Sequence, residues 1–217
     1  MKALFLNIIL LIVAVSATAQ IRPVESLPIA VNYSKTIHLI FPSAVKYSQA
    51  VTDFVAVDNP ENVPHILRIK ANSKSFSKQT TVSVATEGGF FYSFNVSYAD
   101  SLEQTNYFLP GMTSINPDTV FINEVSQTHL IAPEKVIYID YGDTCINVSK
   151  AENTENIIRM IARTGSVQQF PKQTNVSFAT ESGRFFTFNV DYRDKPDAFV
   201  YEVGEKKPEK KANVILT

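Results

Sequence analysis

Residues 78–100 read KQTTVSVATEGGFFYSFNVSYAD, and residues 172–194 repeat them as KQTNVSFATESGRFFTFNVDYRD. From residue 76 to residue 100 the two copies align without a gap at a shift of 94, and 16 of these 25 positions are identical. Upstream the alignment continues at a shift of 91, and it pairs His38, Tyr47 and Arg68 with His129, Tyr138 and Arg159. The chain therefore contains one structural module twice.

Each copy carries the signals of a β-hairpin. Residues 92–98 alternate large apolar with small polar side chains, and residues 186–192 do the same, so we expect a strand with one face in the core and the other toward solvent. The preceding turn keeps glycine only at its last position, Gly89 in the first copy and Gly183 in the second. This predicts a three-residue turn that needs a positive φ at that glycine.

Comparison of the copies also settles an ambiguous segment. Residues 152–163 (ENTENIIRMIAR) have helical propensity, but their counterpart, residues 61–72, contains Pro64 and alternates apolar with polar residues. We therefore expect strands in both copies. With fifteen Phe, nine Tyr and many β-branched residues, the chain is predicted to be all-β, with two tandem homologous β-sandwich (Ig-like) domains of six or seven strands each.

The expected organisation places these domains after a signal peptide. Its parts are a signal peptide at 1–19, a first repeat at 29–104, a linker at 105–119, a second repeat at 120–203 and a charged tail at 204–217. The first segment has the charged, apolar and small-residue order of a secretory signal, which predicts cleavage after Ala19 and a periplasmic protein that is at most peripheral to the outer membrane. The near-neutral charge predicts no direct contact with nucleic acid.

Three segments of the first copy support a family resemblance. These are TIHLIFPSAVKY (36–47), NVPHILRIKA (62–71) and TTVSVATEGGFFYSFNVSYAD (80–100). They resemble the TraN family of conjugative transposon proteins and, more distantly, are similar to the β-sandwich subunit of the VirB-type outer-membrane core complex of type IV secretion systems. The resemblance implies a periplasmic structural component of a DNA-transfer apparatus that forms homo-oligomers or hetero-oligomers with other subunits.

The sequence shows no catalytic motif, and we expect no enzyme activity, cofactor or metal. His38 and His129 recur at equivalent positions and are interpreted as strand-packing histidines with local hydrogen bonds rather than as ligands of a shared metal. Asp140 and Asp143 are interpreted as part of a plain turn, with a weak calcium site as the alternative. Cys145, the single cysteine, is interpreted as a small buried hydrophobe.

Two segments are candidates for partner binding. Val214, Ile215 and Leu216 follow a charged tether and are predicted to form a short strand that pairs with the edge of a neighbouring subunit, the alternative being a disordered end or a strand that folds back. Phe90 and Phe91 interrupt the alternation beside the hairpin turn. They would form the aromatic platform of an alternative function, a secreted adhesin or glycan-binding module.

Overall fold

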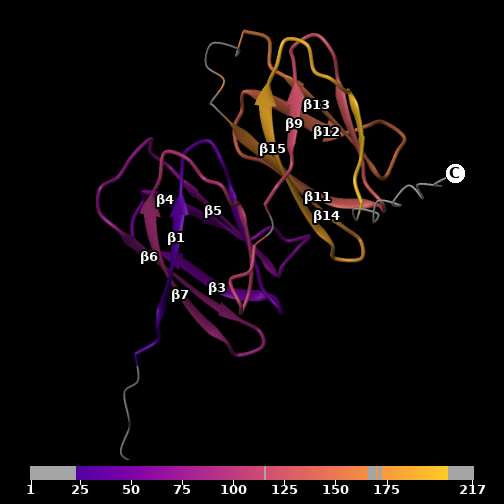
Figure 1. The fold of residues 1–217 in the computed structure, drawn as a ribbon. Coiled ribbons are helices and arrows are strands. Elements are labelled where there is room, and N and C mark those ends of the chain that lie inside the picture. Colours follow the sequence, from indigo (N-terminus) through magenta and orange to yellow (C-terminus); the bar gives the residue numbers. More distant parts are fainter. Residues whose placement is uncertain (1–22, 115, 166–169, 171–172, 205–217) are drawn as a thin grey trace, which may run out of the picture.

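The computed structural model describes residues 23–204 apart from residues 115, 166–169 and 171–172. The described part contains two β-sandwich domains in contact with each other and no helix (Figure 1). This confirms the predicted all-β fold with two tandem Ig-like domains. The predicted signal peptide and the candidate strand at Val214, Ile215 and Leu216 lie outside the described residues.

The first domain has two four-stranded sheets. The first sheet has the order β1-β7-β6-β3 and the second sheet has the order β4-β5-β2-β8. The strands are β1 (Ser26–Val31), β2 (Ile37–Ile40), β3 (Val45–Ala50), β4 (Val55–Asp58), β5 (Ile66–Ala71), β6 (Thr80–Thr86), β7 (Phe91–Tyr98) and β8 (Asn106–Phe108).

The second domain repeats this topology strand by strand. The third sheet, β11-β14-β15-β9, corresponds to the first sheet, and the fourth sheet, β12-β13-β10-β16, corresponds to the second. The strands are β9 (Thr119–Ile122), β10 (Thr128–Ile131), β11 (Val136–Tyr141), β12 (Ile146–Lys150), β13 (Ile157–Ala162), β14 (Thr174–Thr180), β15 (Phe185–Tyr192) and β16 (Val200–Glu202).

Each sandwich closes over its own apolar core. In the first domain, Tyr92, Phe94 and Val96 of β7 point inward and join the buried side chains of β2 and β5. Phe178 and Val190 belong to the matching core of the second domain. Side chains of alternate residues along each strand supply these cores, because successive side chains of a strand point to opposite faces.

The hairpin turns have the predicted geometry. Gly89 and Gly183 have φ values of 79° and 82°, and each donates its N–H to the carbonyl of the threonine three residues earlier. This confirms that the last turn position requires positive φ. The prediction of strands rather than helices in residues 61–72 and 152–163 is also confirmed. These segments contain β5 and β13, which pair antiparallel with β2 and β10.

One strand falls within the segment expected to be a linker. Residues 106–108 form β8, which pairs in parallel with β2 and thereby completes the second sheet. Leu109 follows it into the core of the first domain. The first domain therefore extends beyond residue 104, and the connection to β9 is shorter than the sequence suggested. Each domain has eight strands instead of six or seven.

No helix in the described part of the chain is long and apolar enough to span a bilayer.

Candidate functional site

Corresponding strands of the two repeats are buried to different extents. All seven residues of β14 are buried, whereas its counterpart β6 alternates between buried and half-buried residues. All four residues of β2 are buried, whereas its counterpart β10 alternates in the same way. The extra burial arises because the outward face of the second sheet packs against the outward face of the third sheet. We call this contact the domain junction.

An apolar cluster occupies one part of the domain junction. Ile40, Val63 and Ile66 of the first domain pack against Tyr138 and Ala179 of the second. Partly buried side chains from both domains extend this cluster: Phe108, Ile137 and Phe185. Apolar burial of this kind favours association of the two domains irrespective of direction, so the polar contacts around it fix their relative orientation.

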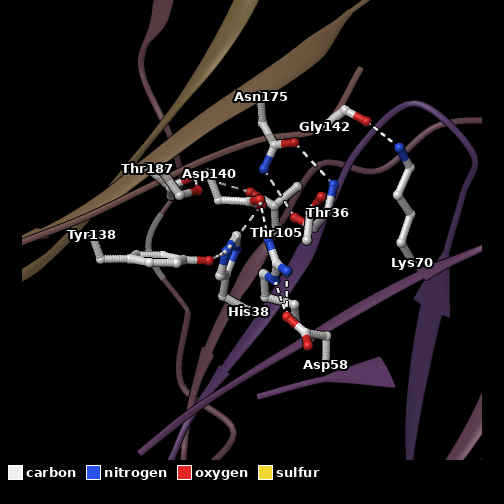
Figure 2. Close-up of polar contacts among 12 residues, drawn as sticks. Thr36, His38, Asp58, Lys70, Thr105, Tyr138, Asp140, Gly142, Asn175 and Thr187 are labelled. Atoms are coloured by element: carbon white, nitrogen blue, oxygen red, sulfur yellow. Dashed lines mark hydrogen bonds and ion pairs between the residues drawn. The ribbon is translucent and has the colours of Figure 1, made fainter. Parts of the chain in front are cut away.

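A network of polar and charged side chains lies beside the apolar cluster (Figure 2). Arg68 Nη1 lies 2.6 Å from Asp140 Oδ1 across the domain junction, and Arg68 also pairs with Asp58 of its own domain. His38 Nε2 lies 3.1 Å from the Tyr138 hydroxyl and 3.4 Å from Asp140 Oδ2. One buried carboxylate of the second domain thus meets two nitrogen-bearing side chains of the first.

The surroundings shift the pKa values of this network. Burial of the Asp140 carboxyl would raise its pKa, but the contacts from His38 and Arg68 outweigh burial and hold the pKa of Asp140 below its usual range. Burial, together with the charge of Asp140, raises the pKa of Tyr138. Asp140 is therefore a carboxylate, and Tyr138 a neutral phenol, at neutral pH.

Lys35 forms a second polar centre of the domain junction. Its buried ammonium donates hydrogen bonds of 2.8 Å to the Leu102 carbonyl, to Gln173 Oε1 and to Asn189 Oδ1. Burial lowers the pKa of Lys35 to about 8, with the charge of Asp191 acting in the opposite direction. All three ammonium protons therefore have acceptors, and two of these acceptors belong to the second domain.

Backbone groups of the segment between β1 and β2 are also bound across the domain junction. The Asn175 amide accepts from Thr36 N–H at 3.0 Å and donates to the Thr36 carbonyl at 2.9 Å. Thr174 Oγ1 donates to the Ser34 carbonyl at 2.7 Å. The two-way amide pair mimics a step of β-sheet hydrogen bonding and fixes the register between the domains.

The backbone of the second domain passes very close to the first at Gly142. A Cβ atom on Gly142 would lie 2.4 Å from the Ser34 carbonyl oxygen and 2.8 Å from Lys35 Cα. Lys70 donates a hydrogen bond to the Gly142 carbonyl (Figure 2). Only glycine therefore fits here, for reasons of space between two backbones.

The two histidines of the repeat, His38 and His129, have different surroundings. His38 is completely buried in the domain junction, and its hydrogen-bond partner, Tyr138, comes from the other domain. The expected local hydrogen bonding of His38 is therefore wrong, because a side chain on the outward face of a sheet is bonded by whatever covers that face. His129 lies at the equivalent position in β10 of the fourth sheet and is half-buried.

Asp140 and Asp143 do not act together. The Asp140 carboxylate is used by Arg68 and His38, and Asp143 Oδ1 accepts from the Cys145 N–H at 2.8 Å. In the described ranges no group of three or more His, Cys, Asp or Glu side chains could hold a metal ion. Cys145 is buried in the second core, and burial raises its pKa to about 12, so its thiol is protonated at neutral pH.

The candidate partner residues near the first hairpin turn are accessible. Phe90 and Phe91 are 58% and 51% exposed. Phe185, the counterpart of Phe91, packs instead against the apolar cluster of the domain junction. Arg184 stands in place of Phe90 and stacks over the Phe186 ring at 5.1 Å. The two aromatic rings are thus side by side in sequence and exposed only in the first domain.

The sequence did not indicate that residues of the domain junction contact another domain, because they do not form a motif. Lys35, Asp140, Gly142 and Asn175 correspond to Ser126, Gln49, Val51 and Thr81 of the other copy. A signal was present in these differences, since a position that departs from a well-preserved repeat marks a changed environment. Departures that cluster on opposing faces of two copies indicate where those copies touch.

Both repeats match a known family model, described as a domain of unknown function (DUF8473), over residues 29–102 and 120–196. The chain belongs to this family. The two matched ranges fall one in each sandwich, and they end before β8 and β16, the strands that complete the second and fourth sheets. No curated protein matches the chain.

The solved structures that are similar to this chain are distant. A pair of tandem immunoglobulin domains of titin is 12% identical, with a TM-score of 0.23 over 79% of this chain and 95% of that chain. An endo-fucoidan hydrolase of glycoside hydrolase family 107 is 7% identical, with a TM-score of 0.25, and only 28% of its length is covered. SGBP-B of the Bacteroides ovatus mixed-linkage glucan utilization locus, solved in complex with a mixed-linkage heptasaccharide, is 11% identical, with a TM-score of 0.22 over 76% of this chain and 43% of that chain.

Proposed function

We propose that this DUF8473 protein is an exported structural subunit that acts by protein–protein contact within a conjugative DNA-transfer apparatus. The observation that carries the structural role is the domain junction. Ion pairs, amide pairs and an apolar cluster join the two sandwiches there. Hydrogen-bonded networks with defined partners fix one geometry, whereas apolar contact alone would allow several.

A fixed pair of domains is useful for assembly because it separates two binding faces by a constant distance. The outward faces of the first and fourth sheets are not used in the domain junction, and they belong to opposite domains. Contact surfaces that are held rigid before binding lose less entropy when a partner docks. A spacer or adaptor subunit requires this property, and catalysis does not explain it.

The assignment to a conjugative apparatus rests on the sequence resemblance to TraN-like proteins and on the predicted signal peptide. The experiment is affinity purification of the tagged full-length protein from cell envelopes of its source, followed by identification of the partners. We expect subunits of a transfer apparatus among the recovered proteins. An Asp140→Ala variant, in which the domain junction is weakened, serves as the matched control and should recover fewer of them. Recovery of no envelope assembly protein would overturn the proposal.

The exposed rings of Phe90 and Phe91 support a second candidate function, the binding of glycans. Aromatic rings bind sugars when their faces are accessible, and both rings are exposed in the first domain. Affinity electrophoresis in gels that contain soluble polysaccharides tests the idea. Retardation of the wild-type protein that is lost in Phe90→Ala and kept in Arg184→Ala would favour glycan binding, and equal mobility in all gels would exclude it for the polysaccharides used.

A further inference from the structure

We propose that a second copy of this chain docks head to tail, with the first sheet of one copy on the fourth sheet of the next, in the manner of the domain junction. The inference rests on the proposed assembly function and names its partner. Within one chain, the outward face of the second sheet already binds the outward face of the third sheet. Because the domains are homologous, the first and fourth sheets carry a related pair of outward faces, and within residues 23–204 neither face packs against the other domain.

The outward face of the first sheet keeps most of the apolar side chains that the third sheet uses in the domain junction, and Lys46 replaces Ile137. Tyr47 corresponds to Tyr138, and Phe91 corresponds to Phe185. Tyr138 is 8% exposed in the domain junction, whereas Tyr47 is 47% exposed and Phe91 is 51% exposed. These are large side chains that the repeat has retained on a face that the described residues of the second domain leave exposed.

The outward face of the fourth sheet carries the complementary hollow. In the second sheet, a hollow is lined by Thr36, Ala56, Asp58, Arg68 and Lys70, and Asp140 and Tyr141 of the second domain project into it. In the fourth sheet, a hollow of about 190 Å³ is lined by the five corresponding residues, Gln127, Asn147, Ser149, Arg159 and Ile161, together with Met160. The same depression therefore exists twice, and among the described residues the other domain caps only the one in the second sheet.

The pairs that would form across the new contact follow from the repeat. His129 would meet Tyr47, as His38 meets Tyr138. Arg159, which bonds Ser149 at 2.8 Å, would meet Gln49 in place of a carboxylate. A hydrogen bond then replaces the Arg68–Asp140 ion pair, so the contact between chains is weaker and more readily reversible than the domain junction.

The edge beside Gly142 differs between the two contacts. Val51 stands in place of Gly142 and Val125 in place of Ser34, and they are 71% and 84% exposed. The backbones cannot approach as closely at Val51 as they do at Gly142. Two exposed valines at opposing positions would fill the wider gap and bury each other. Such a contact joins unlike faces, so it closes into a ring or continues as a filament according to the rotation between subunits.

Cysteine cross-linking of the purified full-length protein tests the arrangement. Val51→Cys and Val125→Cys change exposed side chains, and Cys145 is buried. When the two variants are mixed and oxidised, we expect disulfide-linked dimers that contain one chain of each. Glu61→Cys, in the β4–β5 connection of the second sheet, is the control for random collision. Dimers of like variants, or mixed dimers no faster than the control, would overturn the head-to-tail arrangement.

A substitution that should strengthen self-association provides a second test, which does not depend on a loss of stability or binding. Gln49→Asp restores the carboxylate found at Asp140, so self-association measured by sedimentation should tighten by about fivefold or more, and Arg159→Ala should remove the gain. Gln49→Asn is the matched neutral control, and equal association of the Asp and Asn variants would refute the predicted pairing. A chain that stays monomeric yet recovers envelope partners would refute this inference alone and leave the proposed function standing.

Discussion

Gly142 sits where the backbones of the two domains pass each other. Replacement by Val would push a side chain into the Ser34 carbonyl, which a Cβ would approach to 2.4 Å. We expect Gly142→Val to open the domain junction and to lower the free energy of unfolding by about 2–3 kcal/mol, the usual cost of overpacking. Chemical denaturation followed by tyrosine fluorescence measures this change.

The repeat supplies the control for this substitution. Val51 occupies the equivalent position in the first domain and is exposed, so Val51→Ala should leave the free energy of unfolding within about 0.5 kcal/mol of wild type. If Gly142→Val were as stable as wild type, the close approach of the two backbones would not matter to the fold.

Asp140 gives the domain junction a pH dependence. Its pKa lies below the ordinary value of 3.8, so the carboxylate contributes its full stabilisation at neutral pH and loses it as the pH falls below 3.8 through the folded-state pKa. Asp140→Asn should destabilise the protein by about 2–4 kcal/mol at pH 7, because Arg68 loses its charged partner across the domain junction and keeps only Asp58 of its own domain. Denaturation at a series of pH values should show the difference from wild type narrowing in acid.

Asp143→Asn is the matched control, since an asparagine oxygen can still accept from the Cys145 N–H. It should show little change at pH 7. A loss of stability for Asp140→Asn that stays constant from pH 7 to pH 3 would mean that the ion pair with Arg68 is not its source.

At the scale of strands, β7 and β15 have almost the same sequence and face different surroundings. Thr187 of β15 is 8% exposed, and its hydroxyl lies 3.3 Å from that of Thr105 in the first domain. Ser93, its counterpart in β7, is half-buried on the open first sheet. Thr187→Arg should therefore destabilise the protein by at least about 2 kcal/mol, because it buries a charge at the domain junction.

Ser93→Arg tests the same chemistry at the equivalent strand position. This variant should fold with nearly wild-type thermal stability. The measurement is a comparison of the melting temperatures of Ser93→Arg and Thr187→Arg. Under the head-to-tail proposal it should also weaken association between chains. Equal destabilisation by both arginines would indicate that strand packing within a domain, and not the domain junction, determines the cost.

Strand positions and turn chemistry were accessible from the sequence because they are local. Alternation along β7 predicts which of its side chains face the core of the same domain. Gly89 and Gly183 predict the backbone geometry of the turns. The same alternation failed for β15, where Thr187 and Asn189 were expected to face solvent and are buried. A local pattern distinguishes the core face from the outer face, but it carries no information about what covers the outer face.

At the scale of the whole molecule, the domain junction makes two small sandwiches behave as one unit. The short connection between β8 and β9 links them covalently, and the Arg68, Lys35 and Asn175 contacts link them through space. A tether raises the effective concentration of two faces for each other, so even a modest interface stays closed within one chain. The head-to-tail contact lacks this advantage and therefore depends on protein concentration.

Cutting the connection separates the two effects. A protease site inserted after Asn116, which is exposed, would allow the folded protein to be cleaved between its domains. We expect the two halves to remain together in gel filtration at micromolar concentration, because the apolar cluster and the buried hydrogen bonds persist. In the Asp140→Asn background the halves should separate at a higher protein concentration than the wild-type halves do. Removal of one charged partner raises the dissociation constant by about tenfold or more. Immediate separation of the wild-type halves would show that the connection, and not the domain junction, holds the domains in place.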